Sequence, residues 1–351
     1  MQFETFSDKD KVIRSDVTDA WYDPCPEVIS TITNHLPWLI KNSPPVDANG
    51  LIHTISNVRN IPPHNILVGN GSSDIMFTLF QHVGIRSAVI LDPMYNEYAH
   101  ILQHILNIPF TRIKQKESEH FAIDIEPIIS AGQTHDAVIL VNPNNPTGQH
   151  LTKKKVTYLL NRLPKTTLLI IDESYIEYVG TQESMEQEVQ HHDNLIIIKS
   201  MSKTYALSGL RVGYLVASQP LIEKLSKFQA PWSVNMLAQI AGMIALQNQE
   251  YAVNMIQTTH KLRESLMQGL HNIGLTTIPS KANFFLVKLS KHINAQRIVD
   301  SLAAEKIFIR NPDNQSTQFY GNYIRISVKD QESNTKIIEA LTKAVEQYDK
   351  E

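Results

Sequence analysis

The chain has 351 residues, of which 42% are hydrophobic, and its formal net charge at pH 7 is -3. At roughly 100 to 200 residues per domain, this length accommodates one large domain and one smaller domain, and the charge provides no basic stripe for nucleic acid. The only cysteine is Cys25, which excludes an intramolecular disulfide framework and a cysteine cluster for structural zinc.

The N-terminal sequence and the apolar segments predict the cellular location of the protein. The N-terminal sequence MQFETFSDKDKVIRSD is polar and lacks the apolar core of a signal peptide. No later segment reaches the ~20 apolar residues that a membrane-spanning helix requires. His191 and His192 have no carboxylate or cysteine at ligand spacing, so no metal site is expected. We therefore expect a soluble cytoplasmic protein that acts on a small molecule.

Short aliphatic runs recur through the first two thirds of the chain, at residues 66–68, 88–91, 137–141, 168–171, 195–198 and 214–217. Continuous runs of this length, separated by stretches long enough for a helix, are typical of strands that are buried on both faces of a mostly parallel sheet. The predicted class is α/β, with a large domain in which helices flank this sheet. Ligands of such sheets bind beyond the carboxyl ends of the strands.

The last third of the chain has a different pattern. Residues 284–289, 307–310 and 323–328 read as short, partly alternating strands, and the last segment has apolar residues at helical spacing. We expect a smaller α+β domain there. The predicted boundaries are 40–245 for the large domain, and 1–39 with 246–351 for the small one.

Polar residues follow the early strands. The turn at residues 69–74, GNGSSD, precedes an apolar run, and such a turn at the start of a helix can gather N–H groups around a phosphate through Ser72 and Ser73. It can equally be a tight connection only. Tyr95, near the end of the next strand, can stack on a flat ring or simply cover the core.

Lys203 follows the strand at 195–198, and its surroundings favour covalent chemistry over a solvated surface position. Ser200, Ser202 and Arg211 provide hydroxyl and guanidinium groups for a phosphate around this one amine. Nearby cations and partial burial favour the unprotonated amine that Schiff-base formation needs. A lysine, a phosphate site and an aspartate at strand ends together suit pyridoxal phosphate.

Asp172 directly follows the strand at 168–171, where a carboxylate can cap the next turn. The interpretation that we prefer is a partly buried carboxylate that keeps the pyridine nitrogen of the cofactor protonated. Tyr175, three residues further on, and Asn145, in the run NPNNPTG, can both contact the phenolic oxygen of the cofactor.

These stretches resemble the class I/II aminotransferases of fold type I, and within them the group of histidinol-phosphate aminotransferases and phosphothreonine decarboxylases. The resemblance runs from GNGSSD through NNPTG, DESYIEY and SMSKTYALSGLRVGY to KANFFLVKL and YIRISV. It implies a homodimer in which Lys203 forms the Schiff base, Asp172 pairs with the ring nitrogen, and Arg325 binds the substrate carboxylate. Arg310 would meet the distal group of the substrate. The other implied cofactor contacts are Ser72, Ser73, Tyr95, Asn145, Tyr175, Ser200, Ser202 and Arg211.

Two stretches depart from the family pattern. Residues 18–24 read TDAWYDP where the family has an Asn-Glu-Asn-Pro stretch, and Ser43 stands where the family has a tyrosine that reaches the phosphate across the dimer. Residues 35–45 are similar to the N-terminal region of capreomycidine-synthase-like enzymes, which act on a hydroxyarginine. Asp16, Asp19 and Asp23 would suit its guanidinium, although three solvated carboxylates are the simpler interpretation.

The expected reaction is transamination of an L-amino acid or amine, with the amine of Lys203 acting as acid or base at Cα. Decarboxylation of an O-phospho-threonine or serine and elimination with cyclisation of a hydroxyarginine stay open. The Cα bond that stands perpendicular to the cofactor ring decides between them, and sequence does not determine it. A transcriptional regulator of this fold is disfavoured, because no DNA-binding module accompanies the two domains.

Overall fold

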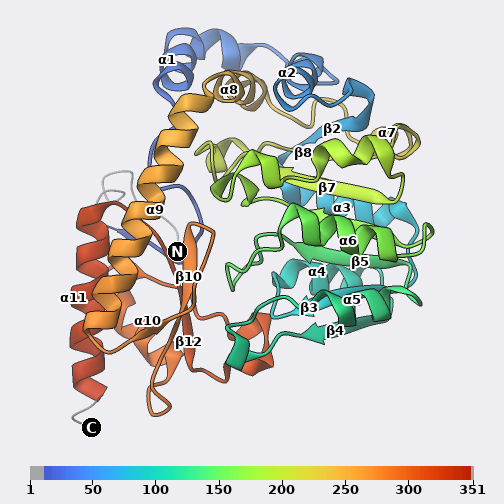
Figure 1. The fold of residues 1–351 in the computed structure, drawn as a ribbon. Coiled ribbons are helices and arrows are strands. Elements are labelled where there is room, and N and C mark those ends of the chain that lie inside the picture. The colour runs from blue at the N-terminus through green and yellow to red at the C-terminus, as the bar shows by residue number, and fades with distance from the viewer. Residues whose placement is uncertain (1–11, 349–351) are drawn as a thin grey trace.

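The structure is a computed structural model that describes residues 12–348. A seven-stranded sheet forms its centre in the order β2-β8-β7-β6-β5-β3-β4 (Figure 1). Strands β4, β3, β5, β6 and β7 are parallel, while β8 is antiparallel to β7 and β2. The strands are β2 (Ile66–Gly69), β3 (Ala88–Asp92), β4 (Phe110–Lys114), β5 (Ala137–Val141), β6 (Leu168–Asp172), β7 (Leu195–Ser200) and β8 (Gly213–Val216). The predicted α/β class and the mostly parallel sheet are confirmed.

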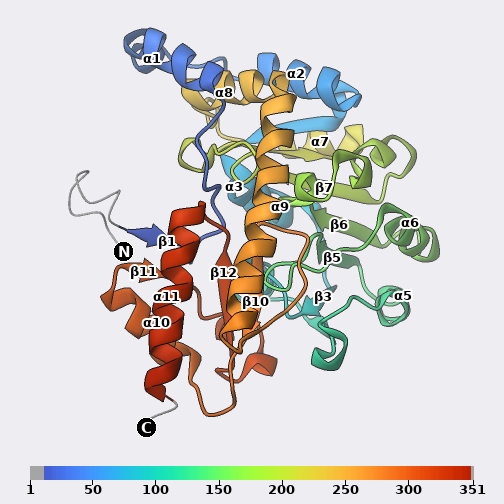
Figure 2. The ribbon, with the colours of Figure 1, turned by 60° about the vertical axis from the view of Figure 1, so that its left-hand side comes forward.

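Helices cover both faces of this sheet, with α3 on one face and α5 and α6 on the other (Figures 1 and 2). Every residue of β3, β5, β7 and β8 is buried. This burial explains why the strands read as unbroken aliphatic runs. The covering helices are α3 (Gly71–Val83), α4 (Asn96–His100), α5 (Ile125–Gly132), α6 (Lys153–Arg162) and α7 (Gln219–Ser226).

A second cluster of buried apolar side chains lies in the C-terminal part, around an antiparallel sheet of order β12-β10-β9. The two-residue strand β1 (Ile13–Arg14) pairs in parallel with β11 (Ile307–Phe308). The remaining elements of this part are β9 (Thr276–Thr277), β10 (Phe284–Lys288), β12 (Tyr323–Ser327), α9 (Gln249–Asn272), α10 (Ala295–Ala304) and α11 (Gln331–Tyr348).

Helices α1 (Pro26–Lys41), α2 (Asn49–Arg59) and α8 (Met236–Gln247) pack together at one end of the molecule (Figure 1). Ile13 packs against the C-terminal cluster. Cys25 and Val28, which the sequence analysis assigned to the small domain, belong to the larger cluster that contains the central sheet. The division at residues 40 and 245 stays a prediction.

Within residues 12–348, no helix is both long and apolar enough to cross a membrane. The same residues contain no group of three or more histidine, cysteine, aspartate or glutamate side chains arranged to hold a metal ion. Most of the polar N-terminal sequence on which the signal-peptide prediction rests lies outside the described residues.

Candidate active site

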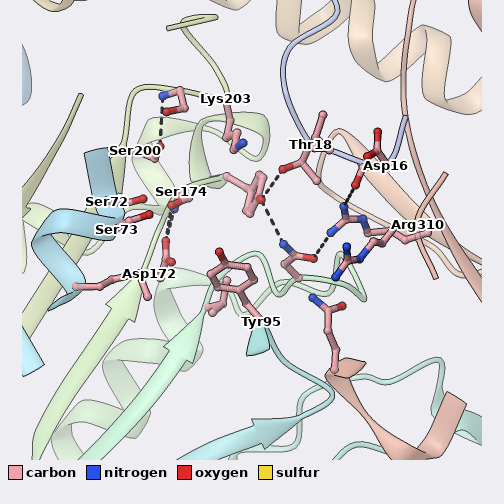
Figure 3. A pocket seen from close by; sticks show the side chains of 18 of the residues that line it. Asp16, Thr18, Ser72, Ser73, Tyr95, Asp172, Ser174, Ser200, Lys203 and Arg310 are labelled. Atoms are coloured by element: carbon pink, nitrogen blue, oxygen red, sulfur yellow. Dashed lines mark hydrogen bonds between the residues drawn. The ribbon is translucent and has the colours of Figure 1, made fainter. Parts of the chain in front are cut away.

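A cavity of about 410 Å³ lies beyond the carboxyl ends of the central strands (Figure 3). It brings together the twelve side chains that the family resemblance implied: Ser72, Ser73, Tyr95, Asn145, Asp172, Tyr175, Ser200, Ser202, Lys203, Arg211, Arg310 and Arg325. Of the three carboxylates nominated for a guanidinium, Asp16 lines the cavity and Asp23 does not, while Asp19 lies outside the lining but is hydrogen-bonded to Lys203. Ser43 is not among the lining residues either.

One corner of the cavity is built for an anion. Ser72 and Ser73 stand in the first turn of α3, whose N-cap residue makes no side-chain capping hydrogen bond. Arg211 lies over this turn, since a Cβ atom at Gly71 would come within 2.5 Å of its Nη2 atom. Its Nη1 atom donates to the Ser208 carbonyl at 3.1 Å. The helix N-terminus, the hydroxyl groups and the guanidinium together favour a phosphate.

Lys203 is held by an ion pair at the edge of this corner. Its Nζ atom lies 2.8 Å from Asp19 Oδ1, which also accepts a hydrogen bond from Ser208 Oγ at 2.8 Å. Burial acts to raise the pKa of Asp19, but the Lys203 ammonium and these hydrogen bonds hold it below its usual value. The Tyr178 hydroxyl fixes the backbone by donating to the Lys203 carbonyl at 3.1 Å.

The Asp172 carboxylate ends β6 at the floor of the cavity. The Ser174 amide and hydroxyl donate to its Oδ1 at 2.9 and 2.5 Å, and the Tyr98 hydroxyl donates to its Oδ2 at 2.8 Å. Burial raises the pKa of Asp172, although these hydrogen bonds act in the opposite direction. Ser174 and Tyr98 were missed by the sequence analysis. The position of Ser174 between Asp172 and Tyr175 in DESY was a signal that could have identified it. Nothing in the sequence indicated a role for Tyr98.

Tyr175 connects the cavity floor to its opposite wall. Its hydroxyl lies 2.9 Å from Thr18 Oγ1 and accepts a hydrogen bond from Asn145 Nδ2 at 3.3 Å (Figure 3). Asn145 Oδ1 in turn accepts from Arg325 Nη1 at 2.8 Å, and Arg325 Nη2 donates to the Asp16 carbonyl at 2.6 Å. The N-terminal segment therefore forms part of the cavity wall. The sequence indicated only that this stretch departs from the family pattern.

Arg325 and Arg310 lie side by side, because their backbones form an isolated antiparallel bridge. Arg325 is buried, and burial lowers its pKa to about 10, so it stays cationic at neutral pH. Arg310 is exposed, and its Nη2 atom makes one long hydrogen bond of 3.4 Å to Asn314 Oδ1. The buried amide of Gln315 lines the cavity beside them, and its Oε1 atom has no hydrogen-bond partner in the described structure.

These residues fit pyridoxal phosphate. The phosphate corner needs a glycine at position 71 to make room for Arg211, and Asp172 provides a buried carboxylate for a ring nitrogen. Lys203 provides the amine, and the partly buried Tyr95 provides an aromatic face, with burial raising its pKa to about 12. Phosphate, ring and aldehyde each have matching groups within one cavity.

The chain matches the family model of aminotransferase class I and II over residues 24–341. It is 31% identical over 291 residues to histidinol-phosphate aminotransferase 1 of Carboxydothermus hydrogenoformans, a match that covers 82% of this chain and 79% of the relative. A protein of Caldanaerobacter subterraneus subsp. tengcongensis that carries the provisional name threonine-phosphate decarboxylase is 30% identical over 281 residues, with coverage of 79% and 76%.

Among solved structures, the histidinol-phosphate aminotransferase from Clostridium acetobutylicum superposes with a TM-score of 0.85 at 27% identity, covering 96% of this chain and 99% of that one. The match of the family model to most of the chain, together with the shared fold, agrees with the chemistry of the cavity. The chain belongs to the class I and II aminotransferases, a family of pyridoxal-phosphate-dependent enzymes.

Proposed function

We propose that this enzyme transfers the amino group of L-amino acids or amines that carry a second anionic group. The observation that supports this proposal most is the pairing of charges on the substrate side of the cavity. Asp16 is held by Arg14 at 2.8 and 2.9 Å, and Asp19 is held by Lys203. Arg325 and Arg310 have no carboxylate partner within the described residues.

Two adjacent arginines without carboxylate partners favour a substrate with two anionic groups. Arg325, buried and fixed by Asn145, suits the α-carboxylate of an amino donor. Arg310, at the open side, suits a distal carboxylate or phosphate. A dicarboxylic donor such as L-glutamate has a group for each arginine, whereas a phosphorylated amine would use Arg310 alone.

The other side chains take the roles that their positions allow. When bound, pyridoxal phosphate supplies the ring that stabilises negative charge at the substrate's Cα. Asp172 would hold a proton on the ring nitrogen, and Ser72, Arg211 and their neighbours would hold the phosphate. The Lys203 amine would move the proton at Cα, with Asp19 as its hydrogen-bond acceptor.

Decarboxylation of an O-phospho amino acid is the second candidate. The contact between Arg310 and Asn314 favours it, since an amide and a guanidinium together can surround a phosphate. A cationic hydroxyarginine is less well supported, because Asp16 and Asp19 already have cationic partners. A guanidinium would have to compete with Arg14 and Lys203 for these carboxylates.

L-Glutamate without an amino acceptor separates the two reactions. The transaminase should release a stoichiometric amount of 2-oxoglutarate in a single half-reaction, detected by mass spectrometry, and the Lys203→Ala variant should release none. Release of carbon dioxide from O-phospho-L-threonine without any keto acid from L-glutamate would instead establish the decarboxylase.

We also infer that the protein is a homodimer. Trp38 and Ile40 near the end of α1 are 56% and 68% exposed, and Val46 just beyond is 57% exposed. Large apolar side chains gathered on one segment are typical of a protein interface. The same segment contains Ser43, so a partner subunit seated here would lie at the stretch where the family places its cross-subunit tyrosine. Analytical ultracentrifugation tests this, with a Trp38→Ser, Ile40→Ser variant expected to dissociate.

A further inference from the structure

Lys329 is a buried cation immediately behind the candidate active site. It follows β12 and its residue is only 8% exposed. Asn334 fixes its backbone from both sides, because the Lys329 amide donates to Asn334 Oδ1 at 2.9 Å and Asn334 Nδ2 donates to the Lys329 carbonyl at 2.7 Å. Its Nζ atom then reaches the Asp19 carbonyl at 3.2 Å. The position of this ammonium is therefore determined at both ends of the side chain.

Residues 15–19, which we call the entrance segment, are attached to the C-terminal part by a series of such contacts. Each contact joins a backbone carbonyl of the segment to a donor on or next to β10 and β12. The donors are the Ser327 amide for Ser15, Arg325 Nη2 for Asp16, Asn283 Nδ2 for Thr18 and Lys329 Nζ for Asp19. The side chains of Thr18 and Asp19 point the other way and contact Tyr175 and Lys203.

The Asp19 carboxylate consequently has two cations near it. Lys203 contacts it directly at 2.8 Å, and the charge of Lys329 also lowers its pKa. Burial lowers the pKa of Lys329 to about 8, although the charges of Asp19 and Asp16 act in the opposite direction. Lys329 is thus mostly charged at neutral pH. Lys329 Nζ contacts the Asp19 carbonyl and not its carboxylate, so it compensates the negative charge of Asp19 from a distance, without an ion pair.

We propose that Lys329 determines substrate specificity by cancelling the charge of Asp19 from behind the entrance segment. This inference rests on the proposed function, in which Arg325 and Arg310 select anionic groups. With Lys329 in place, the Asp19 carboxylate keeps a positive charge nearby when Lys203 leaves the ion pair to take part in chemistry. Without Lys329, Asp19 would present a negative charge that attracts cationic side chains and repels anionic ones.

Binding of two unreactive probes to the holoenzyme tests the proposal without relying on turnover. Glutarate and δ-guanidinovalerate both have a carboxylate for Arg325 and lack the α-amine, but their distal groups differ in charge. Calorimetry at pH 7.5 gives a dissociation constant for each probe, and their ratio measures charge preference. The variants are Lys329→Met, which removes the charge, Lys329→Arg, which keeps it, and Asp19→Asn alone and combined with Lys329→Met.

The wild type should bind glutarate more tightly than δ-guanidinovalerate. Lys329→Met should lower the ratio of the δ-guanidinovalerate dissociation constant to the glutarate dissociation constant by about fivefold or more, as expected for one uncompensated charge nearby. Lys329→Arg should keep the wild-type ratio. The double variant should recover most of the preference, because it lacks the carboxylate that Lys329→Met exposes.

A ratio that is unchanged in Lys329→Met overturns the inference. So does a double variant that stays as altered as Lys329→Met, since the effect would then not act through Asp19. Failure of both probes to bind the wild type would overturn the proposed function, and the inference with it.

Discussion

Glu173 offers a direct test of the electrostatics of a buried cluster of charged side chains. It belongs to a buried cluster with two cations, Arg59 and Lys199, and two further carboxylates, Glu177 and Glu186. Three carboxylates against two cations leave one excess negative charge when all are ionised. Burial raises the pKa of Glu173 to about 7, although the charge of Lys199 opposes this. The cluster becomes neutral when Glu173 binds a proton.

The effect on stability follows from the difference between the folded and unfolded states. The carboxyl has an ordinary pKa of 4.5 and a folded pKa of about 7, so the folded state binds more protons between these values. Stability from this group is therefore fully present below pH 4.5 and is lost as pH rises through 7. At 1.36 kcal/mol for each unit of difference between the two pKa values, the loss is about 3 kcal/mol.

Glu173→Gln removes the titration and keeps the shape of the side chain. Its oxygen can still accept from the Met185 amide, which lies 2.8 Å from Glu173 Oε1. We expect the free energy of unfolding of the variant to equal that of the wild type closely at pH 4.5. At pH 8 it should exceed the wild-type value by about 2 kcal/mol. Urea denaturation followed by circular dichroism across this range measures the difference.

Glu177→Gln is the matched comparison, because the same substitution should act in the opposite direction. Burial acts to raise the pKa of Glu177, but Lys199 and Arg59 hold it below its usual value, and Lys199 Nζ lies 2.7 Å from its Oε1. Loss of this charge should destabilise the protein at pH 8 by about 3 kcal/mol. A Glu173→Gln variant that is equally destabilised at pH 8 would refute the charge-balance argument.

Three further predictions concern the cavity. Lys203→Ala should abolish turnover and keep the far-ultraviolet circular dichroism spectrum of the wild type, so retained activity in purified variant would contradict the role of Lys203. Asp172→Ala should keep part of its bound cofactor, measured by absorbance, and lose most of its activity; near-wild-type turnover would count against the role of its charge. Gly71→Ala should weaken pyridoxal phosphate binding by about tenfold or more, because its Cβ atom would lie 2.5 Å from Arg211 and the residue has φ of 81°. Gly84→Ala, also at positive φ but with no atom near its Cβ, is the control in an equilibrium dialysis assay.

The central sheet was predictable because burial on both faces leaves a strong sequence signal. The run at 137–141 coincides with β5, and the run at 195–198 lies within β7. Strand β4 (Phe110–Lys114) was missed, since its sequence FTRIK has only partly buried and exposed positions at the edge of the sheet. At this edge, β4 shares too little of the core to show an aliphatic run, whereas every residue of β2 at the opposite edge is buried and its run was recognised.

The positions of the site residues were predictable for a related reason. Once parallel strands are identified, the residues that follow them meet at one edge, and Asp172 and Lys203 stand there. Contacts between side chains of different helices and strands left no comparable pattern in the sequence. Tyr98 reaches Asp172 from α4, and its sequence surroundings show only another aromatic residue near a helix.

The entrance segment shows most clearly where sequence reasoning ends. Asp19 was visible as an acidic residue near a rebuilt entrance, and a cationic substrate was a reasonable partner for it. The structure provides that cation from within the chain, since Lys203 pairs with the carboxylate and Lys329, which is 310 residues away, contacts the Asp19 carbonyl. A carboxylate that is already paired selects for nothing by itself, so the specificity of such a pocket depends on which charges remain unpaired. The structure leaves Arg325 and Arg310 without carboxylate partners in the described residues, which supports the proposed anionic substrate over the alternative of a cationic hydroxyarginine.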